Sequence, residues 1–363
     1  MRILHAFKDY FPPTRGGIEH HIHDVCHSLK GFQFAVLTSS RTKKQVIDND
    51  EGVRVIRAAE YARPVSTPYT PSWPKLIRDS GADVLHFHMP NPFGELFYLR
   101  SRSKVPMVAG FYSEIVGREF AKPLFRPFQQ SFLKKARHVI VSSPRLAESS
   151  ESLQPHRAKV VVIPFGVDVS EWTERPEEAD AIKERYPGPL LVFVGRLVYY
   201  KGLDVLMQAM RTVEATCLVL GDGPLRKSLE GKAAELAIRH KVVFLGEKDE
   251  SMKKAFMHAA DLFVLPSTSR AESFGISMME AMACGTPAIS TEVGTGTSWL
   301  NQNNATGIVV SPGDASALAG AIKALLAEPQ RRAEMGHAAS ERVRQHFTRF
   351  AMLESLATLY RSI

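Results

Sequence analysis

The chain has 363 residues, of which 23% are charged, and 46 lysines and arginines against 38 aspartates and glutamates give a formal net charge of +8. This length exceeds what one hydrophobic core usually organises, so two domains are expected. The three cysteines have no paired spacing, which argues against a disulfide or zinc framework. The N-terminus lacks the pattern of a signal peptide, and no apolar stretch reaches about 18 residues. A cytoplasmic protein is therefore predicted.

Positive charge is concentrated in the first half of the chain. Residues 1–168 carry 24 Lys and Arg against 15 Asp and Glu, whereas the remainder carries 22 against 23. A surface facing anionic lipid or a phosphate-bearing acceptor accounts for this division, since each basic group near an anionic leaflet contributes about 1 kcal/mol. A solvated basic surface is the alternative.

The first half alternates between strand and helix patterns. Strands are predicted over 2–7, 34–37, 53–56, 83–87, 106–109, 138–141 and 160–163, with helices over 18–29 and near 124–134. Such alternation predicts a doubly wound parallel sheet. A segment rich in Pro and Glu follows, so we predict a first domain over 1–168 and a linker over 169–189.

A second alternation begins at residue 190. Strands are predicted over 191–194, 216–220, 242–245, 262–265, 287–290 and 307–310, within a second domain over 190–346. The final segment, 347–363, reads as a helix that carries aromatic residues. The fold class predicted from these patterns is α/β, with two parallel-sheet domains.

The run over residues 119–139 interleaves aromatic and basic side chains. Its apolar members are Phe120, Leu124, Phe125, Phe128, Phe132 and Leu133, and its basic members are Lys122, Arg126, Lys134, Lys135 and Arg137. A basic amphipathic helix of this kind can lie on a membrane surface. Two prolines interrupt the run, and packing of the apolar residues in the core is the alternative.

Histidines occur in two groups. On the helix over 18–29, His20, His23 and His27 point away from the apolar face, which favours a solvated surface over a metal site. His86 and His88 share one face of a strand. His88 lies at the carboxyl end, where ligands bind in such sheets, and His86 lies one step deeper. A strand histidine is more often a core residue, so we predict a core position for His86 and leave both readings open for His88 at this point.

The segment LFVLPSTSRAESFGISMMEAMACGTPAIS reads as strand, loop, helix and strand. It contains Glu272 in the loop and, after seven intervening residues, Glu280 on the helix. In such a unit a helix N-terminus offers backbone amides to phosphate at the end of a strand. Two carboxylates beside such amides suit a ligand with both sugar hydroxyls and phosphate.

Two cations, Arg196 and Lys201, follow another strand end in the segment GRLVYYKG, where Gly195 permits close backbone approach. They are placed to neutralise a diphosphate. Gly16 and Gly17 open the first helix in the same manner, and Arg15 beside them is a further candidate for anion contact. The turn that contains Gly223 lacks the third glycine of a dinucleotide-binding motif.

The segment from Glu272 to Glu280, with the trailing AMACGTP, resembles the signature of the retaining glycosyltransferases of family 4, which have the GT-B fold. The glycine pair at 16–17, the GRLVYYKG segment and the GDGP turn at 221–224 match in the expected order and together span most of the chain. The resemblance implies two Rossmann-like domains facing a cleft, with 347–363 crossing back onto the first. It implies transfer of a hexose from a nucleotide diphosphate-sugar to a hydroxyl, with retention of anomeric configuration.

The resemblance also implies roles for single residues. Arg196 and Lys201 would hold the diphosphate, and Glu280 would bind the ribose hydroxyls. Glu272 would bind the sugar together with the backbone that follows it, which comprises Phe274, Gly275 and Ile276. His88 would lie near the donor or acceptor sugar. The loop with Gly16 and Gly17 would meet the donor phosphate and the acceptor. The donor pocket would be lined by Gly195 and Gly223. No catalytic metal and no cofactor are expected.

Donor and acceptor are inferred from the run over 290–298, which resembles that of bacterial mannosyl- and rhamnosyltransferases of surface polysaccharide synthesis. GDP-mannose is the first expectation and a UDP-hexose the second. The acceptor would be a lipid-linked oligosaccharide at the inner membrane face, and no nucleic acid is expected as a partner. An epimerase or phosphorylase of the same fold and a non-catalytic sugar-nucleotide binder are the alternatives. Phe165 departs from the family by replacing an often-seen Asn.

Overall fold

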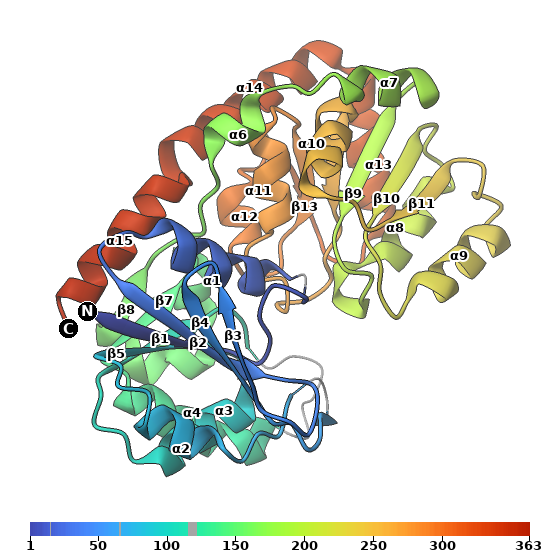
Figure 1. Ribbon diagram of the computed structural model, residues 1–363. Coiled ribbons are helices and arrows are strands. Elements are labelled where there is room, and N and C mark those ends of the chain that lie inside the picture. Colours follow the sequence, from blue (N-terminus) through green and yellow to red (C-terminus); the bar gives the residue numbers. More distant parts are fainter. Residues whose placement is uncertain (15, 65–66, 115–121) are drawn as a thin grey trace. The chain divides into compact units, whose positions relative to one another are not determined.

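A computed structural model describes residues 1–14, 16–64, 67–114 and 122–363, with side chains within 122–124 left undescribed. The chain divides into two compact units, which Figure 1 colours along the sequence. The first unit comprises Met1–Pro164 with Met352–Ile363, and the second comprises Phe165–Ala351. Arg15, Phe120 and the side chains of Lys122 and Leu124, all considered above, lie outside the described residues.

The first unit contains a sheet of eight strands in the order β3-β4-β2-β1-β5-β6-β7-β8. The strands are β1 Arg2–Ala6, β2 Gln33–Ser39, β3 Val46–Asp50, β4 Val53–Ala58, β5 Val84–Met89, β6 Met107–Phe111, β7 His138–Val141 and β8 Val160–Val162. All pair in parallel except the edge hairpin of β3 and β4. The predicted parallel sheet is confirmed.

Strand β3 was not predicted, and it changes the setting of the first helix. Its sequence VIDND has only two apolar residues, and both are exposed. The helix α1 Gly17–Ser28 carries His23 and His27, which are only half-buried because they lie against Asp50 at the end of β3. The expectation of a fully solvated histidine face was therefore wrong for these two residues.

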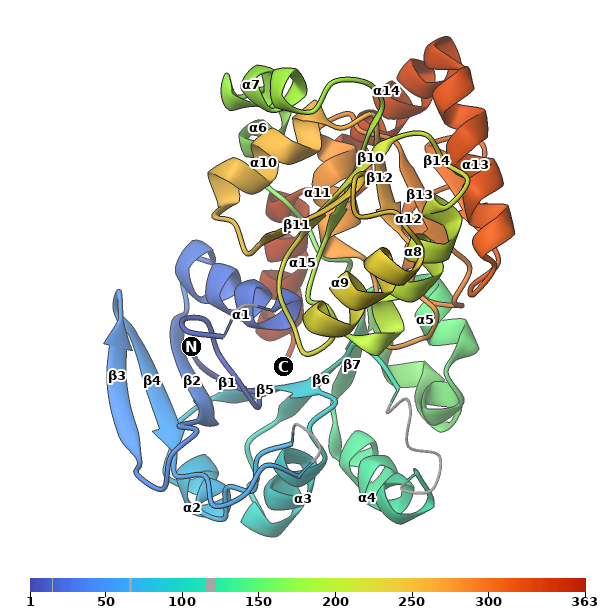
Figure 2. The same cartoon turned by 90° about the vertical axis from the view of Figure 1, so that its right-hand side faces the viewer.

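Helices cover both faces of this sheet (Figures 1 and 2). They are α2 Trp73–Arg78, α3 Pro92–Ser101, α4 Lys122–Lys135 and α5 Pro144–Ser149, with a 3-10 turn over Glu151–Lys159, and α15 Arg349–Arg361. Phe132 of α4 packs on Phe87 of β5, whereas Tyr360 of α15 belongs to the cluster on the opposite face. Alternate strand residues therefore serve two separate apolar layers.

The second unit holds six parallel strands in the order β11-β10-β9-β12-β13-β14. They are β9 Leu190–Val194, β10 Thr216–Leu220, β11 Val242–Gly246, β12 Leu262–Leu265, β13 Ala288–Thr291 and β14 Gly307–Val310. In chain order, β10 and β11 lie on one side of β9, whereas β12 lies on its other side. The topological switch point therefore lies between β9 and β12, where ligands bind in open α/β sheets.

The helices of this unit are α6 Val169–Thr173, α7 Glu178–Arg185, α8 Leu203–Met210, α9 Arg226–Glu235, α10 Glu250–Ala259, α11 Ile276–Ala283, α12 Thr297–Leu300, α13 Ala315–Ala327 and α14 Pro329–His346, with a 3-10 turn over Tyr199–Lys201. The segment 169–189, expected as a linker, instead forms α6 and α7. Trp172 and Ile182 are buried and α7 packs against α10, so this segment is part of the second unit. No helix among the described residues is long and apolar enough to cross a bilayer.

Candidate active site

The loops that leave β9 and β12 lie beside each other, because these strands are neighbours in the sheet. Each loop supplies one charged residue to a close ion pair. Lys201 Nζ lies 2.6 Å from Glu272 Oε2, and the two side chains are only 12% and 9% exposed. Burial lowers the pKa of Lys201, but the Glu272 carboxylate outweighs it, so the pKa lies above its usual value. The ammonium therefore stays charged at neutral pH.

Two hydroxyl groups hold Glu272 in place. The Ser267 hydroxyl donates to Glu272 Oε2 at 3.1 Å, and the Thr295 hydroxyl donates to the Glu272 carbonyl oxygen at 2.6 Å. The carboxylate thus accepts from an ammonium and a hydroxyl at once. Such fixed partners preorganise a charged group, so that little reorganisation is needed when a ligand arrives.

The helix α11 begins at the same edge of the sheet. Gly275 caps it with φ at +87°, and a Cβ there would lie 2.9 Å from the Leu265 side chain, so only glycine fits without strain. The Ser277 hydroxyl donates to the carbonyl oxygen of Val194 at 3.0 Å, which ties the first turn of α11 to the end of β9. First-turn amides have no intrahelical acceptor and attract anions.

Glu280 has a separate partner. Its Oε2 lies 3.0 Å from Nζ of Lys253 on α10, and the same ammonium also pairs with Glu250 and lies 4.9 Å from the centre of the Trp172 ring. Burial raises the pKa of Glu280 more than Lys253 lowers it. Sequence reasoning missed Lys253, because only the fold brings α10 against α11.

The Phe274 side chain lies in the core of the second unit. It is 1% exposed, and its ring centre lies 5.5 Å from that of Phe165 and 5.7 Å from that of Phe347. Only the backbone at this position is therefore available to a ligand. The same contact gives Phe165 a packing role in place of the Asn often seen in the family.

The loops after β9 and β10 approach each other through their backbones. A Cβ on Gly223 would lie 2.5 Å from the carbonyl oxygen of Leu197, and one on Gly221 would collide with the carbonyl oxygen of Gly195. Arg196 is exposed in the first of these loops. The small residues found from the sequence thus permit close loop packing at the carboxyl edge of the sheet.

Gly16 and Gly17 lie in the first unit. The helix α1 begins at Gly17, and Gly16 is its extended N-cap. The buried carboxylate of Glu19 occupies the space that a Gly16 Cβ would need. A carboxyl group therefore already lies at this helix N-terminus, and the roles of both glycines in donor binding stay predictions.

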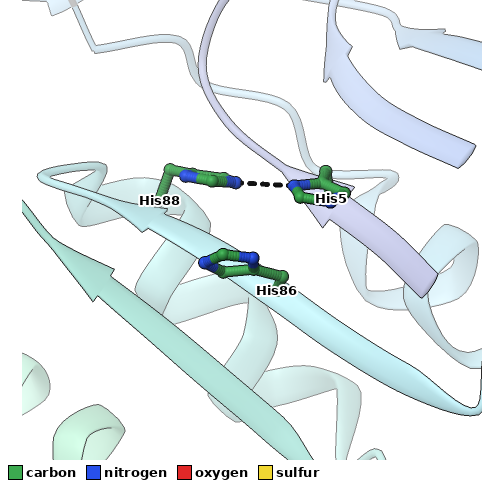
Figure 3. A group of neighbouring side chains, drawn as sticks. All are labelled: His5, His86 and His88. Carbon is green, nitrogen blue, oxygen red and sulfur yellow. Dashed lines mark hydrogen bonds between the residues drawn. The ribbon is translucent and has the colours of Figure 1, made fainter. Parts of the chain in front are cut away.

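His88 belongs to a buried histidine cluster, defined here as His5, His86 and His88 and shown in Figure 3. His5 Nδ1 lies 2.8 Å from His88 Nε2, and His88 Nδ1 lies 2.9 Å from the Tyr112 hydroxyl. His86 is buried as predicted, and its Nδ1 lies 2.7 Å from the Tyr360 hydroxyl. Both ring nitrogens of His88 are thus used inside the first unit, and its role towards a ligand stays a prediction.

Two family models match the chain. One, described as Glycosyltransferase Family 4, covers residues 15–171, and the other, Glycosyl transferases group 1, covers residues 174–342. D-rhamnosyltransferase WbpZ of Pseudomonas aeruginosa is 35% identical over 353 residues, which are 96% of this chain and 92% of that protein. The chain is a glycosyltransferase of family 4. O-antigen chain mannosyltransferase C of Escherichia coli is 30% identical over 367 residues, with 100% and 99% covered.

Solved structures agree on the fold of this glycosyltransferase. Sucrose-phosphate synthase of Thermosynechococcus elongatus superposes with a TM-score of 0.86 at 23% identity, covering 99% of this chain and 98% of the other. Anabaena Alr3699/HepE in complex with UDP-glucose gives a TM-score of 0.80 at 19% identity, with both chains fully covered. The predicted GT-B class of two Rossmann-like domains is thereby confirmed.

The buried histidine cluster makes the protein sensitive to acid. Burial lowers the pKa of His5 to about 3, and burial with neighbouring histidines holds the pKa values of His86 and His88 well below their usual range. Below about pH 6.5 the unfolded chain binds protons that the folded chain does not. The free energy of unfolding should therefore fall by up to about 1.4 kcal/mol per pH unit for each histidine.

The measurement is urea unfolding between neutral pH and pH 5. Wild type and a variant of the exposed His337, His337→Gln, should lose stability in parallel, whereas His86→Phe should show a shallower slope. Equal slopes in all three proteins would contradict the account of the cluster.

Proposed function

We propose that this glycosyltransferase moves mannose from GDP-mannose to a hydroxyl of a surface-polysaccharide acceptor, with retention of anomeric configuration. A UDP-hexose is the second candidate donor. The observation that carries the proposal is the Lys201–Glu272 pair beside the first turn of α11, at the switch point of the second unit. The named activity of the mannosyltransferase relative supports the choice of sugar.

The roles of the residues follow from charge development. As the anomeric carbon leaves the phosphate oxygen, negative charge grows on the diphosphate, and Arg196, Lys201 and the α11 amides stabilise it. Glu272 accepts hydrogen bonds from sugar hydroxyls, and Glu280 binds the ribose. The acceptor oxygen forms its bond to the anomeric carbon on the same face, and the departing phosphate oxygen takes the acceptor proton. The two cations and the amides provide the charge that a metal would supply, so transfer is metal-independent and uses no cofactor.

The acceptor we propose is a lipid-linked oligosaccharide, reached by peripheral association at the inner membrane face. The basic first unit supports this, and so does α4, where Phe128 is 41% exposed and Arg126 is also exposed. Phe132 and Leu133 of the same run are buried in the core, so the surface offered to a membrane is narrower than the sequence pattern suggested.

The proposal is tested with four nucleotides and their sugar donors. GDP should raise the melting temperature more than UDP, ADP or dTDP, because a ligand that binds only the folded state stabilises it. GDP-mannose with a polysaccharide-lipid acceptor should then release free GDP, and release should persist in excess EDTA. If UDP raises the melting temperature more than GDP does, a UDP-hexose is the donor. No response to any nucleotide, or EDTA inactivation rescued by magnesium, would contradict the proposal.

Arg196 gives the cleaner mutational test. Arg196→Ala should lower turnover by roughly 10²–10³-fold, as for other preorganised charge stabilisers, without changing the melting temperature, because the side chain is exposed. Arg211→Ala, an exposed arginine of the same unit, is the matched control and should turn over normally. Near-normal turnover of Arg196→Ala would contradict the proposed role of Arg196 at the diphosphate.

Lys201 differs from the exposed Arg196 in its burial. Because it is nearly buried, Lys201→Ala leaves the charge of Glu272 without its partner, which costs about 3–5 kcal/mol when such a pair is broken. This variant should lose both turnover and thermal stability, and full retention of both would contradict the role of the pair.

A further inference from the structure

A second group of metal-binding residue types lies in the first unit, outside the site described above. His23 and His27 lie one turn apart on α1, in the segment HDVCH, and Asp50 lies at the end of β3. His23 Nε2 and His27 Nε2 each lie 3.7 Å from Asp50 Oδ2. The two rings stack with their centres 4.0 Å apart. All three side chains are half-buried, so the group borders on solvent.

We propose that His23, His27 and Asp50 form a binding site for Zn²⁺. A tetrahedral zinc ion with bonds of 2.0–2.2 Å holds neighbouring ligand atoms roughly 3.4 Å apart. The observed 3.7 Å between each Nε2 and Oδ2 is only a few tenths longer, and the stacked rings would turn on binding so that the in-plane lone pair of each Nε2 points at the ion. Two imidazoles and one carboxylate are a known ligand set for zinc, with water completing the coordination at the exposed side.

The buried histidine cluster fails the same test of geometry. His5 Nδ1 and His88 Nε2 lie 2.8 Å apart, which is a hydrogen-bond distance and too short for two ligands of one tetrahedral ion. All three of its side chains are fully enclosed, which leaves no position for water. Both histidine groups in the described part of the chain bring their ligand atoms close together, and the exposure and spacing of the group at Asp50 make it the better candidate.

Neighbouring groups orient the proposed ligands. His27 Nδ1 lies 2.8 Å from the His23 carbonyl oxygen, to which it donates, and this leaves the lone pair on Nε2. That Nε2 also lies 3.1 Å from the Asp50 carbonyl oxygen, so two lone pairs face each other unless a cation or a proton lies at Nε2. The Tyr10 hydroxyl donates to Asp50 Oδ2 at 2.9 Å and fixes the carboxylate.

Burial and the neighbouring His27 lower the pKa of His23 more than the carboxylates of Asp50, Asp24 and Glu51 raise it. The imidazole is therefore neutral at neutral pH, which is the form that binds a metal. A bound Zn²⁺ would tie α1 to the edge hairpin of β3 and β4. It would therefore stabilise the first unit and take no part in the transfer reaction, which agrees with the activity expected in EDTA.

The test uses full-length, tag-free protein freed of metal with a chelator. Zn²⁺ titrated into wild type should bind with one ion per chain and should raise the melting temperature. His23→Gln and Asp50→Asn should weaken binding at least tenfold and lose the thermal shift. His20→Gln, on the same helix but outside the ligand set, is the matched control and should bind as wild type does. Absence of binding, or equal binding in all four proteins, would overturn the proposal.

X-ray absorption at the zinc edge of the wild-type complex keeps the proposal falsifiable if a variant fails to fold. It should show imidazole nitrogen and carboxylate or water oxygen at about 2.0–2.2 Å, with no sulfur. A sulfur ligand would assign the ion to a cysteine and overturn the proposal.

Discussion

The ion pair between Lys201 and Glu272 is the interaction on which the second unit's site depends. It joins the loop after β9 to the loop after β12, across the point where the strand order reverses. Because both side chains are nearly buried, each charge needs the other, and loss of one leaves the second without compensation. The pair therefore couples the stability of the loops to the position of the charges that a diphosphate-sugar would meet.

Backbone packing places the remaining elements of the site around this pair. Gly275 lets α11 begin against Leu265, and Ser277 anchors its first turn to β9. Phe274 fills the core below the loop, so its backbone is fixed while its side chain is unavailable. Each element thus depends on tight contacts that a larger or more flexible residue would disturb.

The histidines of the first unit show two outcomes of burial. In the cluster of His5, His86 and His88, full enclosure keeps the imidazoles neutral. One hydrogen bond joins His5 to His88, and another joins His86 to Tyr360. His23 and His27 are instead partly exposed, and both lie against the carboxylate of Asp50. The difference arises from depth and from a nearby carboxylate, neither of which residue type alone reveals.

The sequence predicted the two sheets well, because their central strands are continuous apolar runs alternating with helices. The edge strand β3 was missed because apolar and polar residues do not alternate clearly in VIDND, and both of its apolar residues are exposed. Without β3, the contact of His23 and His27 with Asp50 was also invisible. Pairs such as Lys253 with Glu280 depend on packing between helices, and local patterns do not encode it.

Hydrogen–deuterium exchange with and without GDP tests the central claim most directly. If the second unit holds the donor at its switch point, GDP should slow amide exchange in the segments 195–202 and 272–280, including the amides of Gly275 and Ile276. Protection confined to the first unit, or exchange in both segments unchanged by saturating GDP, UDP, ADP and dTDP, would contradict this account.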